Sequence, residues 1–170
     1  MSLPTIIATA CFLRDKGKTL FVDYSVLHNH PIHDGKHAAP GGKVEASDNS
    51  LEEAASREVL EETNIRAYNL IYRGTVLFLN EKRTINGKPM KNNWEVYFYD
   101  CHNFDATDAR PKEGNLVWVN DDNVLDLPLH EGDRVLWGWM QEYQEFKGEV
   151  MHEGDKLTEK RIISGRKLNS

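Results

Sequence analysis

Three glutamates that are close together in the chain have the spacing of a cation-binding helix face. In the segment Arg57-Glu58-Val59-Leu60-Glu61-Glu62, the glutamates stand at positions i, i+3 and i+4, which are neighbours on one face of a helix. Three like charges repel one another, and Mg²⁺ bound through carboxylates, water and phosphate oxygens relieves that repulsion. Arg57 precedes Glu61 by four residues and can pair with it, which would orient one carboxylate. A run of glutamates by itself is more often a solvated helix surface, so the spacing alone does not decide.

A glycine pair and a helix start signal precede these glutamates. The pair is Gly41-Gly42, followed by Lys43, and Ser50 with Glu53 three residues on forms a capping box. The helix that this box predicts extends to Glu62 and has a narrow apolar face, made of Leu51, Ala54, Ala55 and Val59. A glycine-led loop before a capped helix favours a metal–diphosphate site over a solvated surface. Lys43 is a candidate for offsetting phosphate charge.

The remaining segments predict the elements that must position this site. Residues 5–13 and 19–24 flank the turn 15–18 and predict a β-hairpin. Further strands are expected at 68–79, 94–101 and 116–119, with a polar turn at 83–92, and a helix is expected at 133–146. The tail 149–163 could add a strand or hairpin, and about the last eight residues are expected to fray. The sequence thus predicts one mixed α/β domain over residues 1–170.

The segment from Gly42 to Ile65 resembles the Nudix box of the MutT-type hydrolases. That pattern is Gly, five residues, Glu, seven residues, Arg-Glu, an aliphatic residue, any residue, Glu-Glu, any residue, Gly and an aliphatic residue. The matching positions here are Gly42, Arg57, Glu58, Val59, Glu61, Glu62 and Ile65.

Two positions depart from the pattern. One extra residue separates Gly42 from Arg57, so that the expected Glu falls on Asp48 or Asn49. The absence of this glutamate could weaken the anchoring of the loop to the helix. Alternatively, Asp48 could reach the same place from the longer loop and replace it. Asn64 replaces the second Gly, and asparagine tolerates the left-handed conformation of a helix exit, so we expect that exit to survive.

The resemblance implies a fold and a chemistry. It implies a Nudix-like α/β/α sandwich with a mixed central sheet, and cleavage of nucleoside diphosphates linked to another group. Glu58, Glu61 and Glu62 would bind Mg²⁺, with Mn²⁺ as the alternative, or orient the base, and Gly42 would add a carbonyl ligand. Water activated by the metal would attack phosphorus while a carboxylate takes its proton. Glu61, Glu58 and Arg57 are thus the expected catalytic residues of the box.

A weaker resemblance covers the second half of the chain. The stretch from Glu113 to Val119, with Asp126-Leu127-Pro128 and Glu131-Gly132-Asp133, looks like the subgroup that removes oxidised purine nucleotides such as 8-oxo-dGTP. By that likeness Glu113 would be a further metal ligand or base, and Asp133 and Glu131 would hydrogen-bond the purine edge. The alternative is an acidic loop before a helix, with Asp133 placed where the helix dipole favours an anion.

Composition excludes several other classes of protein. The formal net charge of −6 over 170 residues argues against binding nucleic acid through the whole surface, which needs clustered Lys and Arg. Cys11 and Cys101 have no metal-ligand spacing and are expected to be reduced core thiols. No signal-peptide pattern and no apolar run of about 18 residues is present. The expected protein is therefore cytoplasmic, does not contact membranes, and is a monomer or homodimer.

Several aromatic and imidazole side chains have an open role. The histidines at 28, 30, 33 and 37 fit no tetrahedral zinc pattern, so we expect them in a surface loop or a lid over the substrate. Trp118 lies between valines and is expected in the core, although one of the tryptophans could stack on a base.

The predicted reaction is hydrolysis of a nucleoside triphosphate to the monophosphate and pyrophosphate, with 8-oxo-dGTP or a related oxidised purine nucleotide as the substrate. The first alternative is a pyrophosphatase for ADP-ribose or another nucleoside-diphosphate sugar. The second is a Nudix-like domain that binds a nucleotide without cleaving it, as a sensor.

Overall fold

The N-terminal hairpin forms as predicted. The computed structural model describes residues 2–169, so the two ends of the expected 1–170 domain, Met1 and Ser170, lie outside the described residues. Strands β1 (Thr5–Asp15) and β2 (Lys18–Asp23) pair antiparallel. Lys16 and Gly17 connect them at φ values of 50° and 77°, the left-handed conformations that a tight two-residue hairpin turn requires.

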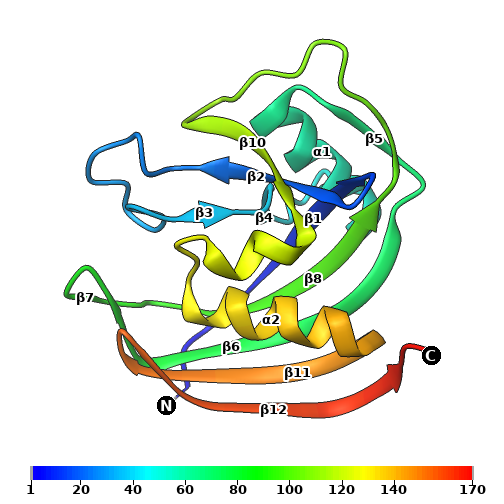
Figure 1. The fold of residues 1–170 in the computed structure, drawn as a ribbon. Helices are drawn as coiled ribbons and strands as arrows, with labels where there is room; N and C mark the ends of the chain where they lie inside the picture. Colours follow the sequence, from blue (N-terminus) through cyan, green and yellow to red (C-terminus); the bar gives the residue numbers. More distant parts are fainter. Residues whose placement is uncertain (1, 170) are drawn as a thin grey trace.

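A large mixed sheet forms the centre of the molecule (Figure 1). It has ten strands, and its main path runs in the order β10-β2-β1-β8-β6-β11-β12. The pairs β1–β8 and β6–β11 are parallel, and the other pairs are antiparallel. The remaining strands of this path are β6 (Ile71–Ile85), β8 (Asn93–Cys101), β10 (Asn115–Asn120), β11 (Tyr143–Gly154) and β12 (Lys156–Lys167).

Short strands complete the sheet at its margins. Strand β3 (His37–Ala38) pairs with β2, β4 (Gly41–Lys43) with β1, and β7 (Lys88–Pro89) with β6. A separate two-stranded sheet joins β5 (Arg66–Tyr68) to β9 (Asn103–Asp105). None of these five short strands was predicted from the sequence.

Helices cover both faces of the large sheet. Helix α1 (Leu51–Thr63) packs against one face, and helix α2 (Glu131–Glu142) packs against the other, together with the 3₁₀ helix η1 (Asp121–Asp126). Successive side chains of a strand point to opposite faces, and Phe12 accordingly packs among residues of α2 while Leu13 packs among residues of α1. The expected α/β/α sandwich with a mixed sheet is therefore confirmed.

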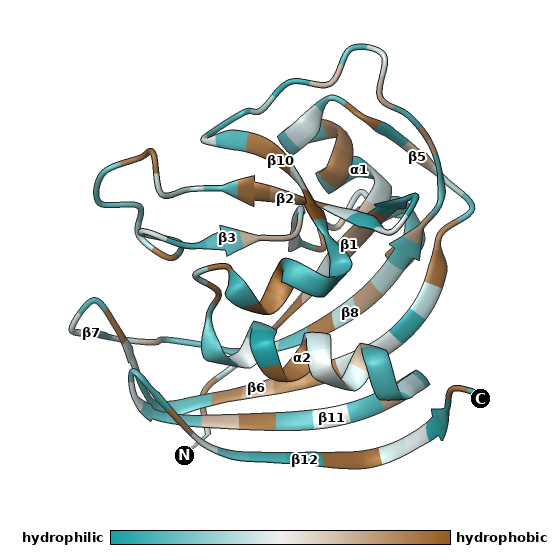
Figure 2. Ribbon diagram, viewed as in Figure 1, coloured by the Kyte–Doolittle hydropathy of each residue, from teal (hydrophilic) through white to brown (hydrophobic). Residues whose placement is uncertain are grey.

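Hydrophobic residues are concentrated where these layers meet (Figure 2). The core on the α2 side is rich in aromatic rings, with Phe12, Phe21 and Trp137 in mutual contact. Strand β12, at the outer edge of the sheet, is mostly hydrophilic (Figure 2). Within residues 2–169, no helix has the length and apolarity needed to span a bilayer.

The predicted helix 133–146 was wrong at both ends. Helix α2 starts at Glu131, and from Tyr143 onward the chain is strand β11, with Phe146 paired to Gly74. Arg73 of β6 fixes this change, because its guanidinium donates to the carbonyl oxygens of Met140 at 2.8 Å, Tyr143 at 2.9 Å and Gln144 at 2.8 Å. The side chain that ends the helix is about 70 residues away in the sequence, so local periodicity could not reveal it.

Two further predictions change in detail. Half of the polar turn expected at 83–92 is strand, since β6 continues to Ile85 and the chain turns back through Asn86 and Gly87 into β7. The tail does form a hairpin, as one alternative proposed, but a longer one than 149–163, because β11 and β12 together extend from Tyr143 to Lys167.

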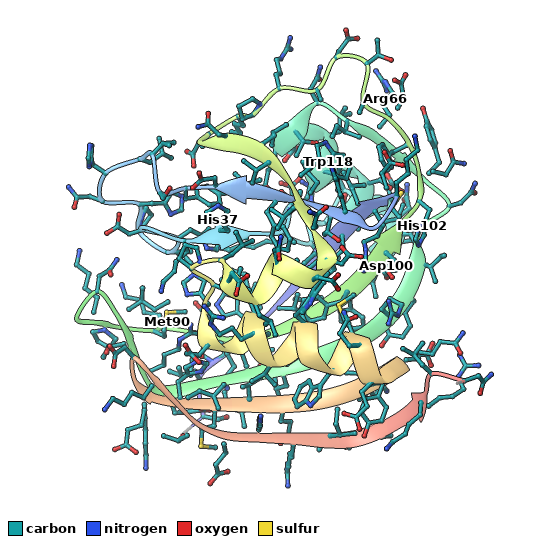
Figure 3. The ribbon with its side chains drawn as sticks, viewed as in Figure 1. His37, Arg66, Met90, Asp100, His102 and Trp118 are labelled. Atoms are coloured by element: carbon teal, nitrogen blue, oxygen red, sulfur yellow. The ribbon has the colours of Figure 1, made fainter. Side chains whose placement is uncertain are left out.

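Trp118 does not lie in the core, contrary to the prediction. It is 39% exposed and projects from β10 (Figure 3), where its ring stacks on Phe104 at a centroid distance of 5.7 Å. Strand β10 pairs only with β2 along the main path of the sheet, so valine neighbours did not imply burial there. Cys11 and Cys101 are buried free thiols, as expected.

Candidate active site

The start of the acidic helix is fixed by two hydrogen bonds. Ser50 is the N-cap of α1, and its side chain accepts a bond from the backbone N–H of Glu53 at 3.0 Å. The Glu53 carboxylate accepts from the N–H of Asn49 at 3.2 Å, one residue earlier than a standard capping box would have it. The predicted helix start is confirmed, and it determines where along the helix the glutamates emerge.

Asp48, one of the two residues aligned with the missing glutamate of the box, binds Arg57 of the helix. Arg57 donates to its two carboxylate oxygens from Nε at 2.8 Å and from Nη2 at 2.9 Å, and the Asp48 side chain is only 2% exposed. The Arg57 guanidinium holds the pKa of Asp48 below its usual range. Arg57 also donates to the carbonyl oxygen of Lys43 at 3.0 Å. Of the two outcomes considered for the longer loop, the structure has the one in which Asp48 reaches the helix.

Arg57 also contacts two of the glutamates. Its Nη1 lies 3.2 Å from Glu61 Oε2 and 3.0 Å from Glu58 Oε1, so the predicted pairing of Arg57 with Glu61 is confirmed. One guanidinium therefore connects the loop carboxylate to the carboxylates of the helix.

The glycine pair packs directly against the helix. A Cβ atom on Gly42 would lie 2.5 Å from the Glu58 carboxyl carbon, so a larger residue at that position would displace the Glu58 carboxylate. The N–H of Gly41 donates to Glu62 Oε2 at 3.2 Å. The two glycines thus bring main-chain atoms to the carboxylates of Glu58 and Glu62.

Glu58 pairs with Arg57, but no cation of the described chain lies at ion-pair distance from the Glu62 carboxylate. Burial raises the pKa of Glu62 to about 8, and it also raises the pKa of Glu58. Glu62 forms no ion pair with any residue of the described chain. Closely placed carboxylates with too little positive charge around them suit a hard divalent cation, which prefers oxygen ligands.

Asn64 ends the helix in the way predicted for it. It has φ 55° and ψ 25°, the left-handed conformation, and its backbone N–H bonds to the carbonyl oxygen of Leu60. Its side chain donates to the carbonyl oxygen of Asp108 at 2.9 Å. The second departure from the Nudix pattern therefore leaves the helix exit intact.

A loop brings a fourth glutamate to this helix. Glu113, Glu58, Glu61 and Glu62 line one small cavity of about 110 Å³, together with Val22, Tyr24 and Lys112. The backbone N–H of Lys112 donates to the carbonyl oxygen of Glu62 at 2.9 Å, which fastens the loop to the end of α1. The structure therefore brings together all four glutamates that the sequence proposed as metal ligands.

Within residues 2–169, no three His, Cys, Asp or Glu side chains converge closely enough to form a complete metal site as they stand. The directions of the side chains explain this. Glu58 and Glu61 face Arg57, and Glu113 faces His30. Closing the set around an ion would require these side chains to turn away from Arg57 and His30.

A larger cavity lies on the other side of the glycine pair, between α2 and the sheet. It has a volume of about 370 Å³, within the range of small-molecule sites. Its walls are mainly apolar, and its polar side chains are Thr9, His33, Lys43, Asn80, Arg83, His130 and Asp133. Gly41 and Gly42 line this cavity and also contact the carboxylates of Glu62 and Glu58, so the two cavities adjoin.

Of the two acidic residues expected at a purine edge, only Asp133 lines the large cavity. It lies in the first turn of α2, and burial raises its pKa to about 6 against the opposing charge of Arg83. Glu131 is 60% exposed and lies 3.7 Å from Arg134 on the same helix. Lys43 lines the cavity too, with Nζ 5.7 Å from the ring centre of Trp94.

Arg83 and Asn80 of β6 also line the cavity, and sequence reasoning missed them. Arg83 lies 3.5 Å from Asn80 Oδ1, and it has no carboxylate partner at ion-pair distance in the described chain. A weak signal was available, since both polar residues follow the apolar strand Thr75–Leu79. Asn80, however, fell outside the predicted strand 68–79, and Arg83 was assigned to the turn 83–92.

Comparison with known proteins identifies the family. A model of the NUDIX domain matches residues 4–140, which is most of the chain. The chain belongs to the Nudix hydrolase family. The Nudix match ends inside α2, so the β11–β12 hairpin lies beyond it.

Similar proteins fall in the same family. An uncharacterised Nudix hydrolase of Bacillus subtilis (strain 168), YvcI, is 26% identical over 107 residues, which span 62% of this chain and 65% of that protein. The mutator MutT protein from Bacillus halodurans superposes with a TM-score of 0.73 at 24% identity, covering 93% of this chain and 97% of the other. The NUDIX domain of Shewanella oneidensis NrtR, solved with ADP ribose, gives a TM-score of 0.57 at 20% identity, covering 82% and 88%.

Proposed function

We propose that this Nudix domain hydrolyses a nucleoside triphosphate to the monophosphate and pyrophosphate, and that its substrate is 8-oxo-dGTP or a related oxidised purine nucleotide. The observation that carries the proposal is the adjacency of two cavities across Gly41 and Gly42: one holds four glutamates, and the other is apolar and large enough for a nucleoside. A nucleotide lying across the glycine pair would place its phosphates at the carboxylates and its base against α2.

Nudix hydrolases generally use divalent metal ions, and we propose Mg²⁺ here, with Mn²⁺ as the alternative. Glu58, Glu61, Glu62 and Glu113 would hold it, together with the carbonyl oxygen of Gly42. When bound, such an ion polarises phosphate oxygens and favours the ionisation of water. Glu61 lines the small cavity and is half-exposed, and its carboxylate can accept a proton from the attacking water.

Other residues of the chain would orient the nucleotide. Lys43 lies at the glycine pair, where its charge can offset that of a phosphate group. In the large cavity Asp133 can accept a hydrogen bond from a base N–H, and Arg83 can donate one to a base carbonyl. An acceptor and a donor in an apolar cavity can discriminate between bases, because a mismatched partner leaves a buried polar group without a hydrogen bond.

We further propose that the substrate is a free nucleotide rather than nucleic acid and that the protein acts as a monomer or homodimer. The net charge of −6 supports the first part, because it disfavours a phosphate backbone spread over the surface.

The test is the release of pyrophosphate from 8-oxo-dGTP, dGTP, ATP and ADP-ribose, with and without Mg²⁺. We expect metal-dependent release, with 8-oxo-dGTP turned over well above dGTP. Glu62→Gln keeps the shape of the side chain and removes its charge, so kcat should fall about a hundredfold, or about 3 kcal/mol of transition-state stabilisation. Glu159→Gln on β12 is the matched control and should behave as wild type. Equal turnover by Glu62→Gln would contradict the metal assignment.

A second candidate is hydrolysis of ADP-ribose or another nucleoside-diphosphate sugar, which the ADP ribose bound to the Shewanella NUDIX domain favours. Its products would be a nucleoside monophosphate and a sugar phosphate, with no pyrophosphate. Metal-dependent binding without turnover of any nucleotide would instead indicate a sensor. The two departures from the box, which first suggested a sensor, no longer support it, because Asp48 and Asn64 make the required contacts.

A further inference from the structure

The segment between β2 and β3 forms a stack of histidine rings beside the acidic cavity. The rings of His30 and His33 pack on the buried ring of Tyr24 at centroid distances of 4.7 Å and 4.8 Å. The two histidines are 5.3 Å apart. His37, labelled in Figure 3, begins β3 at the end of the segment. The histidine-rich segment, residues 24–36, is thus ordered by its own aromatic contacts.

Hydrogen bonds to one nitrogen of His30 fix the position of its proton. Nδ1 accepts from the backbone N–H of Ile32 at 3.2 Å and from that of His33 at 2.9 Å. A ring nitrogen that accepts N–H bonds carries no proton, so the neutral ring carries it on Nε2. This proton-bearing nitrogen lies 3.3 Å from Glu113 Oε2.

The main chain of Glu113 is held firmly, while its side chain has few partners. Lys112 is bonded to the end of α1. Gly114 has φ 66°, and a Cβ atom on it would lie 2.3 Å from the carbonyl oxygen of Asp23, so the loop passes very close to the end of β2. The Glu113 side chain is 54% exposed, and among the described residues its one charged or polar side-chain contact is His30.

The same segment also contacts the large cavity. His33 Nδ1 lies 3.1 Å from His130 Nε2, and both rings line that cavity. His130 is the N-cap residue of α2, three positions before Asp133. The histidine-rich segment therefore touches both parts of the site, the base cavity through His33 and the acidic cavity through His30.

We propose that His30 is a positioning residue that directs the Glu113 carboxylate in the acidic cavity. This role of His30 rests on the metal role proposed above for Glu113. Without the Nε2–H group, a half-exposed glutamate side chain would sample several rotamers, and fewer molecules would have the carboxylate in place. Partners that orient a metal ligand commonly affect metal affinity or activity about 10- to 100-fold.

Two substitutions distinguish the two roles of His30, which are to accept hydrogen bonds within the turn and to contact Glu113. His30→Asn keeps an acceptor near the place of Nδ1, because an Asn side chain can accept from N–H groups two or three residues on, but it is too short to reach Glu113. His30→Gln can present an N–H near the place of Nε2 and loses the turn acceptor. His28→Asn makes the same change at an exposed position of the segment and serves as the control.

The test is a double-mutant cycle of His30→Asn with Glu113→Gln, read by Mn²⁺ binding in electron paramagnetic resonance and by kcat and KM. We expect His30→Asn to weaken Mn²⁺ binding and to lower kcat about tenfold each, with the nucleotide KM little changed. In the Glu113→Gln background, His30→Asn should lower the Mn²⁺ affinity and kcat by no more than about twofold. His30→Gln and His28→Asn should stay close to wild type.

The inference is overturned if the losses caused by His30→Asn and Glu113→Gln multiply in the double variant. It is also overturned if His30→Asn binds Mn²⁺ as tightly as the wild type does. If His30→Asn fails to fold, His30→Gln decides, because a tenfold loss in that variant with an unchanged Tm contradicts a role of the N–H group. Mn²⁺ binding by Glu113→Gln equal to wild type also overturns the inference. By contrast, the absence of turnover by the wild type would overturn the proposed function and leave the Mn²⁺ cycle as a valid test of His30.

Discussion

The contact between Asp48 and Arg57 joins the glycine turn to the acidic helix. Aspartate is one methylene shorter than the glutamate of the Nudix pattern, and the loop that carries it is one residue longer. The main chain thus covers the distance that the side chain does not, and the guanidinium still donates two short hydrogen bonds to the carboxylate. Arg57 in turn lies between Glu58 and Glu61, so the position of a loop residue affects the orientation of the carboxylates.

This arrangement predicts the effect of Asp48→Ala. The variant leaves Arg57 free to bind Glu58 and Glu61 more tightly, in competition with the metal, and kcat should fall about tenfold with a higher Mg²⁺ requirement. Steady-state kinetics over a range of Mg²⁺ concentrations measure both effects. Asn49→Ala is the control, because Asn49 was the other residue aligned with the missing glutamate and, within residues 2–169, its side chain hydrogen-bonds only to Glu53. A larger loss in Asn49→Ala than in Asp48→Ala would reverse the assignment.

Residues of the box could be predicted from the sequence because their spacing lies within one helix and one loop. Glu58, Glu61 and Glu62 are neighbours by helical geometry alone. Arg83 could not be placed in the same way, because its approach to Asp133 depends on where β6 ends relative to α2. The contact between His30 and Glu113 likewise joins residues that are far apart in the chain.

At the scale of elements, the exit of α1 depends on one residue in the left-handed region. Asn64 has φ 55° and also anchors the loop through Asp108. The exit directs the chain into β5, and the backbone of the loop before Glu113 returns to this end of the helix, where Arg110 donates to the carbonyl oxygen of Thr63 at 2.9 Å. The helix end therefore supports the loop that carries Glu113.

The conformation of Asn64 can be tested by two substitutions. Asn64→Val places a β-branched residue in the left-handed region, whereas Asn64→Gly adopts that region without strain. The free energy of unfolding should be about 1–2 kcal/mol lower for Val than for Gly. Urea denaturation followed by circular dichroism measures the difference. Equal stabilities of the two variants would contradict the left-handed assignment.

Element boundaries were predicted less well than element types. The two helices, the hairpins and the long strands were found from periodicity and turn residues, but α2 was extended through Tyr143 and Phe146. The apolar spacing of these residues fits a helix, but they form a strand because β11 pairs with β6. Arg73 stabilises this arrangement through its hydrogen bond to the carbonyl oxygen of Tyr143. The five short strands were missed because two or three residues carry no periodicity.

At the scale of the whole molecule, a network of buried charges connects the sheet to α2 and η1. Asp100 of β8, labelled in Figure 3, pairs with Arg73 and lies 3.3 Å from Arg14. Arg14 also pairs with Asp121 of η1, with 2.9 Å between Nη2 and Oδ2, and its guanidinium carbon lies 5.1 Å from the ring centre of Trp137. Because Arg73 also holds the end of α2, one carboxylate supports contacts to several elements.

Removing that carboxylate should destabilise the whole domain. Asp100→Ala leaves two largely buried guanidinium groups with less negative charge, and the free energy of unfolding should fall by about 3 kcal/mol. Chemical denaturation gives the value. Asp155→Ala, at the exposed turn between β11 and β12, is the control and should leave stability unchanged. Similar values for the two variants would show that the network does not stabilise the fold.

His152 makes stability depend on pH. It is 1% exposed, its Nδ1 has no hydrogen-bond partner among residues 2–169, and burial lowers its pKa to about 4. Between that value and the ordinary value of about 6.5, the unfolded chain binds a proton that the folded chain does not, so stability is lost as the pH falls.

Between pH 7.5 and pH 5.5 this loss should be about 1 kcal/mol, or about 2–4 °C in Tm. His152→Asn cannot take up the proton, so its Tm should fall less than that of the wild type over this interval, whatever its Tm at pH 7.5. His102→Asn, at an exposed position (Figure 3), should keep the wild-type slope. If Tm changes with pH equally in His152→Asn and in the wild type, protonation of His152 is not linked to unfolding.

The parallel pairing of β6 with β11 sets an order of events during synthesis. Strand β8 is the next long strand after β6 in the chain and can pair with it early, but the other edge of β6 waits for residues 143–154, which are synthesised later. Until then Val76 and Phe78 belong to a strand with an open edge, which is a template for pairing with other chains. Helix α2, which carries Asp133 and forms one wall of the large cavity, is also synthesised late. Nascent chains paused before β11 would therefore contain the complete acidic loop and helix, but would expose a strand prone to aggregation.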